Sequence, residues 1–149
     1  MNRTNQNNVS VSISQAIFSG DAQKLQSLLE DFMLQSISSM DGANEGFYHG
    51  MMLGLCAVLG NRYQVRSNRE SGIGRFDIQL TPLVSGIPGF LFEFKHTKDE
   101  HVDLADLADS ALQQIDEKRY DTELRNAGVY SIIKIGIAFR GKNAVVKRG

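Results

Sequence analysis

The fold of this chain is decided by the stretch Phe90-Leu91-Phe92-Glu93-Phe94-Lys95. Consecutive residues of a β-strand point to opposite faces of a sheet, so the three phenylalanines share one face, while Glu93 and Lys95 lie on the other. An earlier stretch, Phe76-Asp77-Ile78-Gln79-Leu80, has the same period of two and places Asp77 opposite its apolar residues. If the two stretches pair as a hairpin, the side chains of Asp77, Glu93 and Lys95 converge on one spot.

The rest of the sequence predicts an α/β fold with a mixed β-sheet of four to five strands flanked by helices. Apolar residues at helical spacing predict three helices, the first of which has Asp21 as its N-cap. A hairpin-rich region is followed by a helical crossover back into the sheet, and the last strand returns after a turn at Gly141-Lys142. The predicted strands cover residues 63–67, 75–80, 89–95, 132–139 and 144–147, and the predicted helices cover residues 21–37, 44–59 and 103–123.

Length and composition indicate one globular domain. The chain has 149 residues, of which 42 % are hydrophobic and 22 % are charged, as in ordinary folded proteins. No apolar run approaches the roughly 18 residues that span a bilayer, and the Asn-rich N-terminus has no hydrophobic signal region. The single cysteine, Cys56, agrees with a reducing compartment. We therefore expect a cytoplasmic protein with a flexible polar lead-in at residues 1–12 and one domain at residues 13–149.

The charges are unevenly placed along the chain. The formal net charge is −1, from 16 Lys+Arg and 17 Asp+Glu, which excludes a bulk polycation. Basic residues gather around the first two predicted strands and again from Leu124 to the C-terminus, where no acid occurs. Such groups can bind a phosphate backbone, although a solvated surface explains the charge alone equally well. The two groups are Arg62, Arg66, Arg69 and Arg75, and Arg125, Lys134, Arg140, Lys142, Lys147 and Arg148.

Asp77, Glu93 and Lys95 form a combination suited to metal-dependent hydrolysis. Carboxylates from neighbouring strands, about 4.8 Å apart, can share a cation such as Mg²⁺, which prefers oxygen ligands and often binds substrate phosphate. A lysine kept protonated by the two acids can orient a water or neutralise charge on the phosphate, so the arrangement suits phosphodiester hydrolysis. The alternative is a structural ion pair on a half-buried sheet. Charges in an apolar core are costly without a purpose, and we favour a site.

Several motifs in order give the sequence a family resemblance. The pattern Asp77…Glu93-Phe94-Lys95 resembles the D…(D/E)-X-K signature of the PD-(D/E)XK nuclease superfamily. Over residues 16–146 the chain is similar to the nuclease-like domain that many bacteria carry at the C-terminus of AAA-ATPase-like proteins. The other matching motifs are Glu45-Gly-Phe-Tyr48-His49, Ser67-Asn-Arg-Glu-Ser-Gly-Ile-Gly-Arg-Phe-Asp77, Ala111-Leu-Gln-Gln-Ile-Asp-Glu-Lys-Arg-Tyr120 and Gly136-Ile-Ala-Phe-Arg-Gly-Lys142.

The resemblance implies a restriction-endonuclease-like core and a role for each matching residue. Asp77, Glu93 and the main-chain carbonyl of Phe94 would bind Mg²⁺ or Mn²⁺. Lys95 would assist the attacking water. Glu45 would face the site from its helix and act through water or a second metal, although an acid here also favours a helix N-terminus.

Two further residues resemble the accessory Gln…Tyr pair of some branches of the superfamily. Gln114 lies beside the apolar stripe of its helix, whereas Gln113 points to solvent, so Gln114 is the better candidate. Tyr120 falls on the far side of an ideal helix, and only the resemblance recommends it. One departure is Phe76, which stands where the superfamily usually has a proline, but proline supplies no ligand.

The sequence thus predicts a Mg²⁺- or Mn²⁺-dependent nuclease that hydrolyses DNA phosphodiester bonds. The alternative is a catalytically silent module that binds nucleic acid or a partner and serves an attached ATPase. The expected partners are nucleic acid and an AAA-ATPase-like domain in cis or in trans, and no membrane is expected. The sequence defines no dimer interface. The residues expected to contact nucleic acid are Arg69, Arg75, Tyr120, Arg140 and Lys142.

Overall fold

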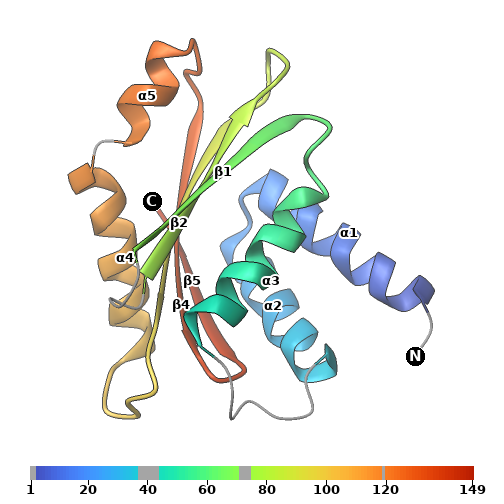
Figure 1. Cartoon of the computed structure of the whole chain (residues 1–149), viewed down its shortest axis with the longest axis vertical. Helices are drawn as coiled ribbons and strands as arrows, with labels where there is room; N and C mark the ends of the chain where they lie inside the picture. The colour runs from blue at the N-terminus through green and yellow to red at the C-terminus, as the bar shows by residue number, and fades with distance from the viewer. Residues whose placement is uncertain (1–2, 37–43, 71–74, 119) are drawn as a thin grey trace.

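A five-stranded sheet forms the middle layer of the protein, in the order β1-β2-β3-β4-β5 (Figure 1). The computed structural model describes residues 3–36, 44–70, 75–118 and 120–149. Neighbouring strands are antiparallel except for β3 and β4, which are parallel, so the predicted mixed sheet is confirmed. The strands are β1 (Tyr63–Glu70), β2 (Arg75–Pro82), β3 (Gly89–His96), β4 (Ile132–Arg140) and β5 (Asn143–Arg148).

Helices cover both faces of this sheet (Figure 1). One face is covered by α1, α2 and α3, and the other by α4 and α5, which together form the crossover between β3 and β4. A crossover is needed there because two parallel neighbours cannot be joined by a hairpin. The helices are α1 (Arg3–Ser19), α2 (Ala22–Ser36), α3 (Glu45–Ala57), α4 (Leu104–Lys118) and α5 (Tyr120–Asn126).

The phenylalanine face of β3 forms the centre of the main core. Phe90, Phe92 and Phe94 are fully buried and pack with apolar residues of β2, β4 and α1–α3. Phe76 of β2 stacks on its register partner Phe94, with 4.4 Å between the ring centroids. Because side chains alternate along a strand, the opposite face of β3 points to α4.

The lead-in expected at residues 1–12 has regular structure from Arg3 on, because α1 covers this segment. The last turns of α1 are held by Ile13, Ala16 and Ile17, which are buried in the main core. A helix that is nucleated by such packing extends at little cost per residue, even through polar turns. The segment from Arg3 to residue 12 is therefore helical, while its separation from a domain that begins at residue 13 stays a prediction.

The helix expected at residues 103–123 is in fact two helices, α4 and α5. Ile115 of α4 and Leu124 of α5 are both buried against Leu91 of β3. On one straight helix these two residues would be rotated by about 180° from each other, so both could not contact the same strand residue. The two helices run in different directions (Figure 1), so both side chains reach the sheet.

The starts of two helices agree with the sequence. The Asp21 carboxylate accepts a hydrogen bond from the backbone N–H of Lys24 at 3.1 Å, which confirms the predicted N-cap of α2. At the start of α3, the Asn44 side chain accepts from the N–H of Phe47 at 3.1 Å. This helix ends earlier than predicted, with Val58 as its C-cap.

The free edge of β5 is covered by side chains of α2. The N–H of Val146 donates to the Gln26 side chain at 3.0 Å, and the N–H of Ala144 donates to the Glu30 carboxylate at 3.4 Å. The Arg148 guanidinium donates to the carbonyl of Gly20 at 3.0 Å. This strand is therefore fixed both by β4 and by the helical layer.

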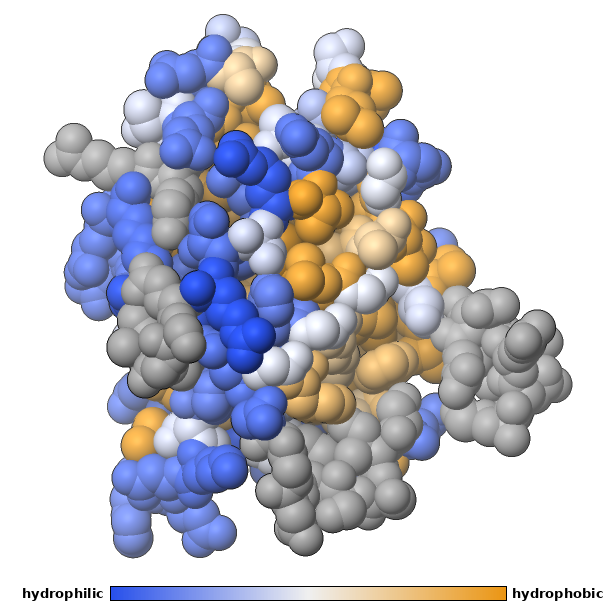
Figure 2. All heavy atoms as spheres, in the orientation of Figure 1, coloured by the Kyte–Doolittle hydropathy of each residue, from blue (hydrophilic) through white to orange (hydrophobic). Residues whose placement is uncertain are grey.

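The two sides of the molecule differ in hydropathy. On the face seen in Figure 2, hydrophilic residues gather over the α4 side and hydrophobic residues over the α3 side. A shallow apolar groove of about 520 Å³ lies among α1, α2 and α3, with Phe32, Phe47 and Met51 in its lining. Among the described residues, no helix is both long and apolar enough to cross a membrane.

Candidate active site

Two buried carboxylates face each other across the hairpin of β2 and β3. Asp77 and Glu93 are direct register partners, so their side chains leave the same face of the sheet. The Asp77 residue is 6 % exposed, and Glu93 is completely buried. Pairing of the two predicted strands therefore brings together the two acids, as the alternation in the sequence predicted.

The carboxylate face is closed by α4, which packs against β3, β4 and β5. Gly136 of β4 is the parallel register partner of Glu93 and has backbone atoms of α4 directly above it. A strand position without a side chain allows this close approach. As a result, the carboxylates lie in a layer between the sheet and α4 rather than on an open surface.

Three polar residues of α4 stand at intervals of four, and the first and last of them contact residues of the carboxylate face. They are Ser110, Gln114 and Lys118, and residues four apart lie on one side of a helix. The Lys118 ammonium lies 3.5 Å from Oε1 of Glu93, and Ser110 accepts a hydrogen bond from Lys95 at 3.1 Å. The half-buried Gln114 has its Oε1 atom buried without a hydrogen-bond partner among the described residues.

Of these three residues, the sequence predicted only Gln114 at the site. The exposure of Gln113 agrees with the choice between the two glutamines. The signal that could have found the others is their own periodicity, since Ser110 and Lys118 stand four residues before and after Gln114.

Burial dominates the electrostatics of Glu93. Removal from water raises the pKa of its carboxyl to about 7; the Lys118 ammonium opposes this shift, and the nearby Asp77 adds to it. Oε1 of Glu93 faces Lys118, but its Oε2 atom is buried with no hydrogen-bond partner among the described residues. A buried carboxylate oxygen without a donor is costly, and a bound cation would satisfy it.

Lys95 is on the carboxylate face, but its ammonium is directed to α4. It donates to Oγ of Ser110, which in turn donates to the carbonyl of Leu107 at 2.7 Å. Burial lowers the pKa of Lys95, while the charge of Glu93 opposes this and that of Arg75, its register partner, adds to it. The lysine is therefore near the acids and held in place by a serine.

Asn68 is a site residue to which the sequence assigned no role. It is the β1 register partner of Asp77, and its Nδ2 atom donates a hydrogen bond to Oδ1 of Asp77 at 3.2 Å. The contact fixes one oxygen of the carboxylate. Asn68 lies in one of the motifs that carry the family resemblance, which was the available signal.

Glu45 lies on the other face of the sheet. Its Oε2 atom forms an ion pair at 3.1 Å with Nε of Arg69. Arg69 is the register partner of Phe76, whose ring belongs to the core under α1–α3. The described contacts of Glu45 are thus with this face and not with the Asp77–Glu93 pair.

Some of the residues expected to contact nucleic acid already form hydrogen bonds or ion pairs within the protein. Arg140 donates to the carbonyls of Asp99 and Val102 at 2.9 and 2.7 Å and so holds the connection between β3 and α4. Arg69 is paired with Glu45 as described. Lys142 is half-buried in the turn between β4 and β5. Tyr120 begins α5, but its side chain lies outside the described part of the structure.

The donor set fits a divalent cation held by two carboxylates. Within the described residues, no group of three or more His, Cys, Asp or Glu side chains is placed to hold a metal. The Asp77–Glu93 pair instead offers two hard oxygen donors, one of them the unsatisfied Oε2 of Glu93. Mg²⁺ is commonly held by one or two carboxylates, with water and substrate phosphate as the other ligands.

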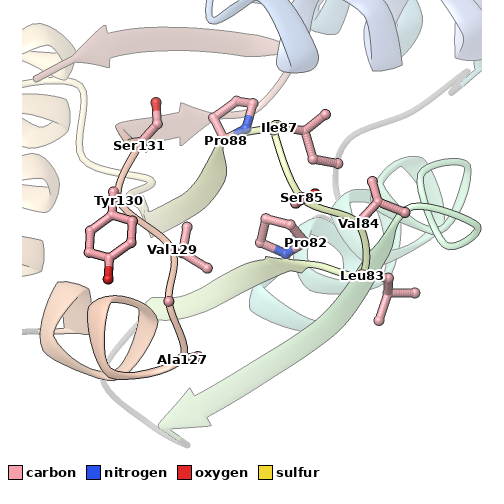
Figure 3. Close-up of a pocket in the computed structure, with 12 residues that line it drawn as sticks. Pro82, Leu83, Val84, Ser85, Ile87, Pro88, Ala127, Val129, Tyr130 and Ser131 are labelled. Carbon is pink, nitrogen blue, oxygen red and sulfur yellow. The ribbon is translucent and has the colours of Figure 1, made fainter.

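A groove without such groups lies elsewhere. It has a volume of about 600 Å³ and lies between the β2–β3 connection and the α5–β4 connection (Figure 3). Pro82, Leu83 and Tyr130 are among its lining residues, so it is at the strand ends beyond the carboxylate layer. Its lining offers hydroxyl groups but no carboxylate or ammonium group, and we do not assign the chemistry to it.

The mixed sheet, the helical crossover and the paired acids define a restriction-endonuclease-like protein. The chain belongs to the PD-(D/E)XK nuclease superfamily, since the model of that family matches residues 43–149. No curated protein is similar enough to the chain to be named as a relative.

Proposed function

We propose that this protein is a Mg²⁺- or Mn²⁺-dependent nuclease that hydrolyses DNA phosphodiester bonds. The observation that carries the proposal is the register pair of Asp77 and Glu93, with its buried and unsatisfied Oε2 atom. Membership of a nuclease superfamily supports the same chemistry.

Asp77 and Glu93 are the residues proposed to hold the cation. The main-chain carbonyl of Phe94, implied by the family resemblance, is proposed as a third donor. A bound Mg²⁺ or Mn²⁺ ion supplies Lewis acidity toward a phosphate oxygen and lowers the pKa of a coordinated water. Asn68 keeps the Asp77 carboxylate oriented through its amide N–H.

Lys95 is proposed to orient the attacking water and to neutralise charge that develops on the phosphate. Its position is fixed by Ser110, and its lowered pKa follows from burial. A preorganised cation of this kind costs no reorganisation when the charge develops. Gln114 is proposed as an accessory polar residue because its Oε1 is buried without a hydrogen-bond partner among the described residues and it stands one helical turn from both Ser110 and Lys118.

The nucleic acid is proposed to bind along the basic residues at the ends of the strands. Arg75 shares the carboxylate face with Lys95, and Lys142 and Lys147 lie on the β4–β5 hairpin. Tyr120 is kept in this proposal through the resemblance alone. The contact with Arg69 supports a structural role for Glu45 in place of the expected site role. An AAA-ATPase-like partner, in cis or in trans, also remains a proposal.

The test is cleavage of supercoiled plasmid and of labelled oligonucleotides in Mg²⁺, Mn²⁺ or EDTA. The proposal expects cleavage with either cation, none in EDTA, and none for Asp77→Asn. The exposed Asp31 of α2 provides the matched control, and Asp31→Asn should cleave like the wild type. Binding without metal-dependent cleavage of any DNA or RNA form would favour the silent binding module instead.

A further inference from the structure

Lys118 forms the one ion pair of Glu93 that the described residues contain. Its ammonium lies 3.5 Å from Oε1 of Glu93, and its side chain is 21 % exposed, whereas that of Glu93 is completely buried. Lys95, the lysine expected at this site, donates to Ser110. Of these two lysines, the one that pairs with the buried carboxylate therefore comes from α4 and not from β3.

We propose that Lys118 is a positioning residue of this site: its ammonium neutralises Glu93 in the metal-free protein and gives up that contact when a divalent cation binds between Asp77 and Glu93. This inference rests on the proposed function, because it assumes that the carboxylate pair is a metal site. It adds a residue and a role that the sequence did not predict.

The first argument is the cost of buried charge. Asp77 and Glu93 face each other in a layer closed by α4, and a buried carboxylate that has lost water needs a counter-charge. Only one oxygen of Glu93 faces Lys118, so the pairing is incomplete and leaves Oε2 unsatisfied. A divalent cation would neutralise both acids and would repel the ammonium at the same time.

The second argument is the place of Lys118 in the fold. It is the last residue of α4, and its side chain reaches Glu93 from the partly exposed end of that helix. A lysine side chain has a flexible four-carbon stem and a strongly hydrated head. Its ammonium can therefore move from Glu93 into water without any change in the backbone of the helix.

The test compares Lys118→Met with Lys134→Met. Lys134 of β4 is a matched control because its ammonium pairs with an acid of α4, Asp116, at 2.7 Å. It does not pair with Asp77 or Glu93 among the described residues. Melting temperatures are measured in EDTA and in Mn²⁺, and Mn²⁺ affinity is measured by calorimetry at pH 8.5. We expect Mn²⁺ to raise the melting temperature of Lys118→Met by more than that of the wild type, and its dissociation constant to fall about tenfold. Lys118→Arg keeps the charge and should bind Mn²⁺ like the wild type.

A purely structural Lys118 would lower the melting temperature equally in EDTA and Mn²⁺ and leave the affinity unchanged, which would overturn the inference. A wild-type protein that binds no Mn²⁺ would overturn the proposed function as well. Wild-type Mn²⁺ binding with unchanged affinity in Lys118→Met would overturn only the inference.

One measurement needs no variant and covers the case in which Lys118→Met does not fold. The wild-type protein is treated with an amine-acetylating reagent in EDTA or in Mn²⁺, and each lysine is quantified by peptide mass spectrometry. We expect acetylation of Lys118 to increase severalfold in Mn²⁺, while that of Lys134 stays the same. Equal acetylation of Lys118 in both conditions would overturn the inference.

Discussion

Gly136 of β4 lies directly beside Glu93 of β3, and this pair determines how closely α4 can cover the buried carboxylate. A Cβ atom on Gly136 would lie 2.5 Å from the carbonyl oxygen of Ala108 and 2.7 Å from the backbone nitrogen of Leu112, both in α4. These are backbone atoms, so no rotamer change could make room. The missing side chain thus brings the polar residues of α4 within reach of the site.

Gly136→Ala should therefore destabilise the protein by about 1–3 kcal/mol, the usual cost of forcing extra atoms into a packed layer. The measurement is the free energy of unfolding from urea titration. Gly54→Ala is the control, and it should change the free energy of unfolding in the opposite direction. Gly54 lies inside α3 with nothing near its absent Cβ, so alanine should stabilise the helix by about 0.5–1 kcal/mol. Equal stability of both variants would contradict the close approach of α4.

Asp77→Asn should remove most Mn²⁺ binding, because a neutral amide is a poor ligand for a hard cation. The measurement is calorimetric titration with Mn²⁺ above pH 8, where Glu93 is ionised. Asp31→Asn, on the exposed side of α2, should bind like the wild type. Unchanged Mn²⁺ binding by Asp77→Asn would mean that the metal is held elsewhere.

Lys95→Ala should lower the single-turnover cleavage rate by about 10²–10³, as usual when one preorganised charge is removed. Mn²⁺ binding should survive, because the ammonium of Lys95 is directed to Ser110 and is not a ligand. Lys98→Ala, in the exposed connection after β3, serves as the control and should cleave normally. Cleavage by Lys95→Ala at the wild-type rate would exclude the proposed role.

The stability of the metal-free protein should depend on the ionisation of Glu93. Its pKa is raised from 4.5 to about 7, so the folded state binds more protons than the unfolded state between these values. The free energy of unfolding should then fall by roughly 3 kcal/mol as the pH rises from 4.5 to 7. His49 and His96 oppose this trend, because burial lowers their pKa values and makes their contribution rise with pH.

The contribution of Glu93 is isolated by comparison with Glu93→Gln, which keeps the shape and removes the titration. The difference in unfolding free energy between the two proteins, measured in EDTA at several pH values, should change across the window from 4.5 to 7. A difference that is constant over this range would contradict the raised pKa.

DNA affinity should fall steeply with salt, with a log–log slope of about −0.9 per phosphate contact on duplex DNA. Removing the charges of Lys142 and Lys147 together should flatten the slope, and the measurement is fluorescence anisotropy with a labelled duplex in Ca²⁺. Arg140→Ala should flatten it too if this residue contacts phosphate, and should also loosen the loop whose carbonyls it binds. Binding that does not depend on salt would place the nucleic acid elsewhere.

The pairing of Asp77 with Glu93 could be predicted because it depends only on two strands that follow each other in the sequence. The alternation along each strand fixes which face a side chain occupies, and a hairpin makes the two strands neighbours. The same reasoning could not place Lys118, because its contact depends on where α4 crosses the sheet. That position is set by the missing side chain of Gly136, which is far away in the sequence.

Tertiary packing also decides two features that the sequence did not indicate. Glu45 begins α3 as predicted, but the side of the sheet on which that helix packs places its carboxylate beside Arg69. The polar composition of residues 1–12 gave no sign of α1, since its support comes from the packing of Ile13 and Ile17 in the main core. Local propensity is a weak guide where tertiary packing decides.

The contacts of Gln26 and Glu30 with β5 have a consequence for self-association. An uncovered strand edge is a template on which another chain can add its own strand, and repeated addition leads to aggregation. These two side chains occupy backbone donors of β5, so α2 protects that end of the sheet. Strand addition is thereby left to β1, the other outer strand, which carries the exposed Arg66. Like charges on two approaching copies repel each other, so Arg66 acts against fibre growth at this edge.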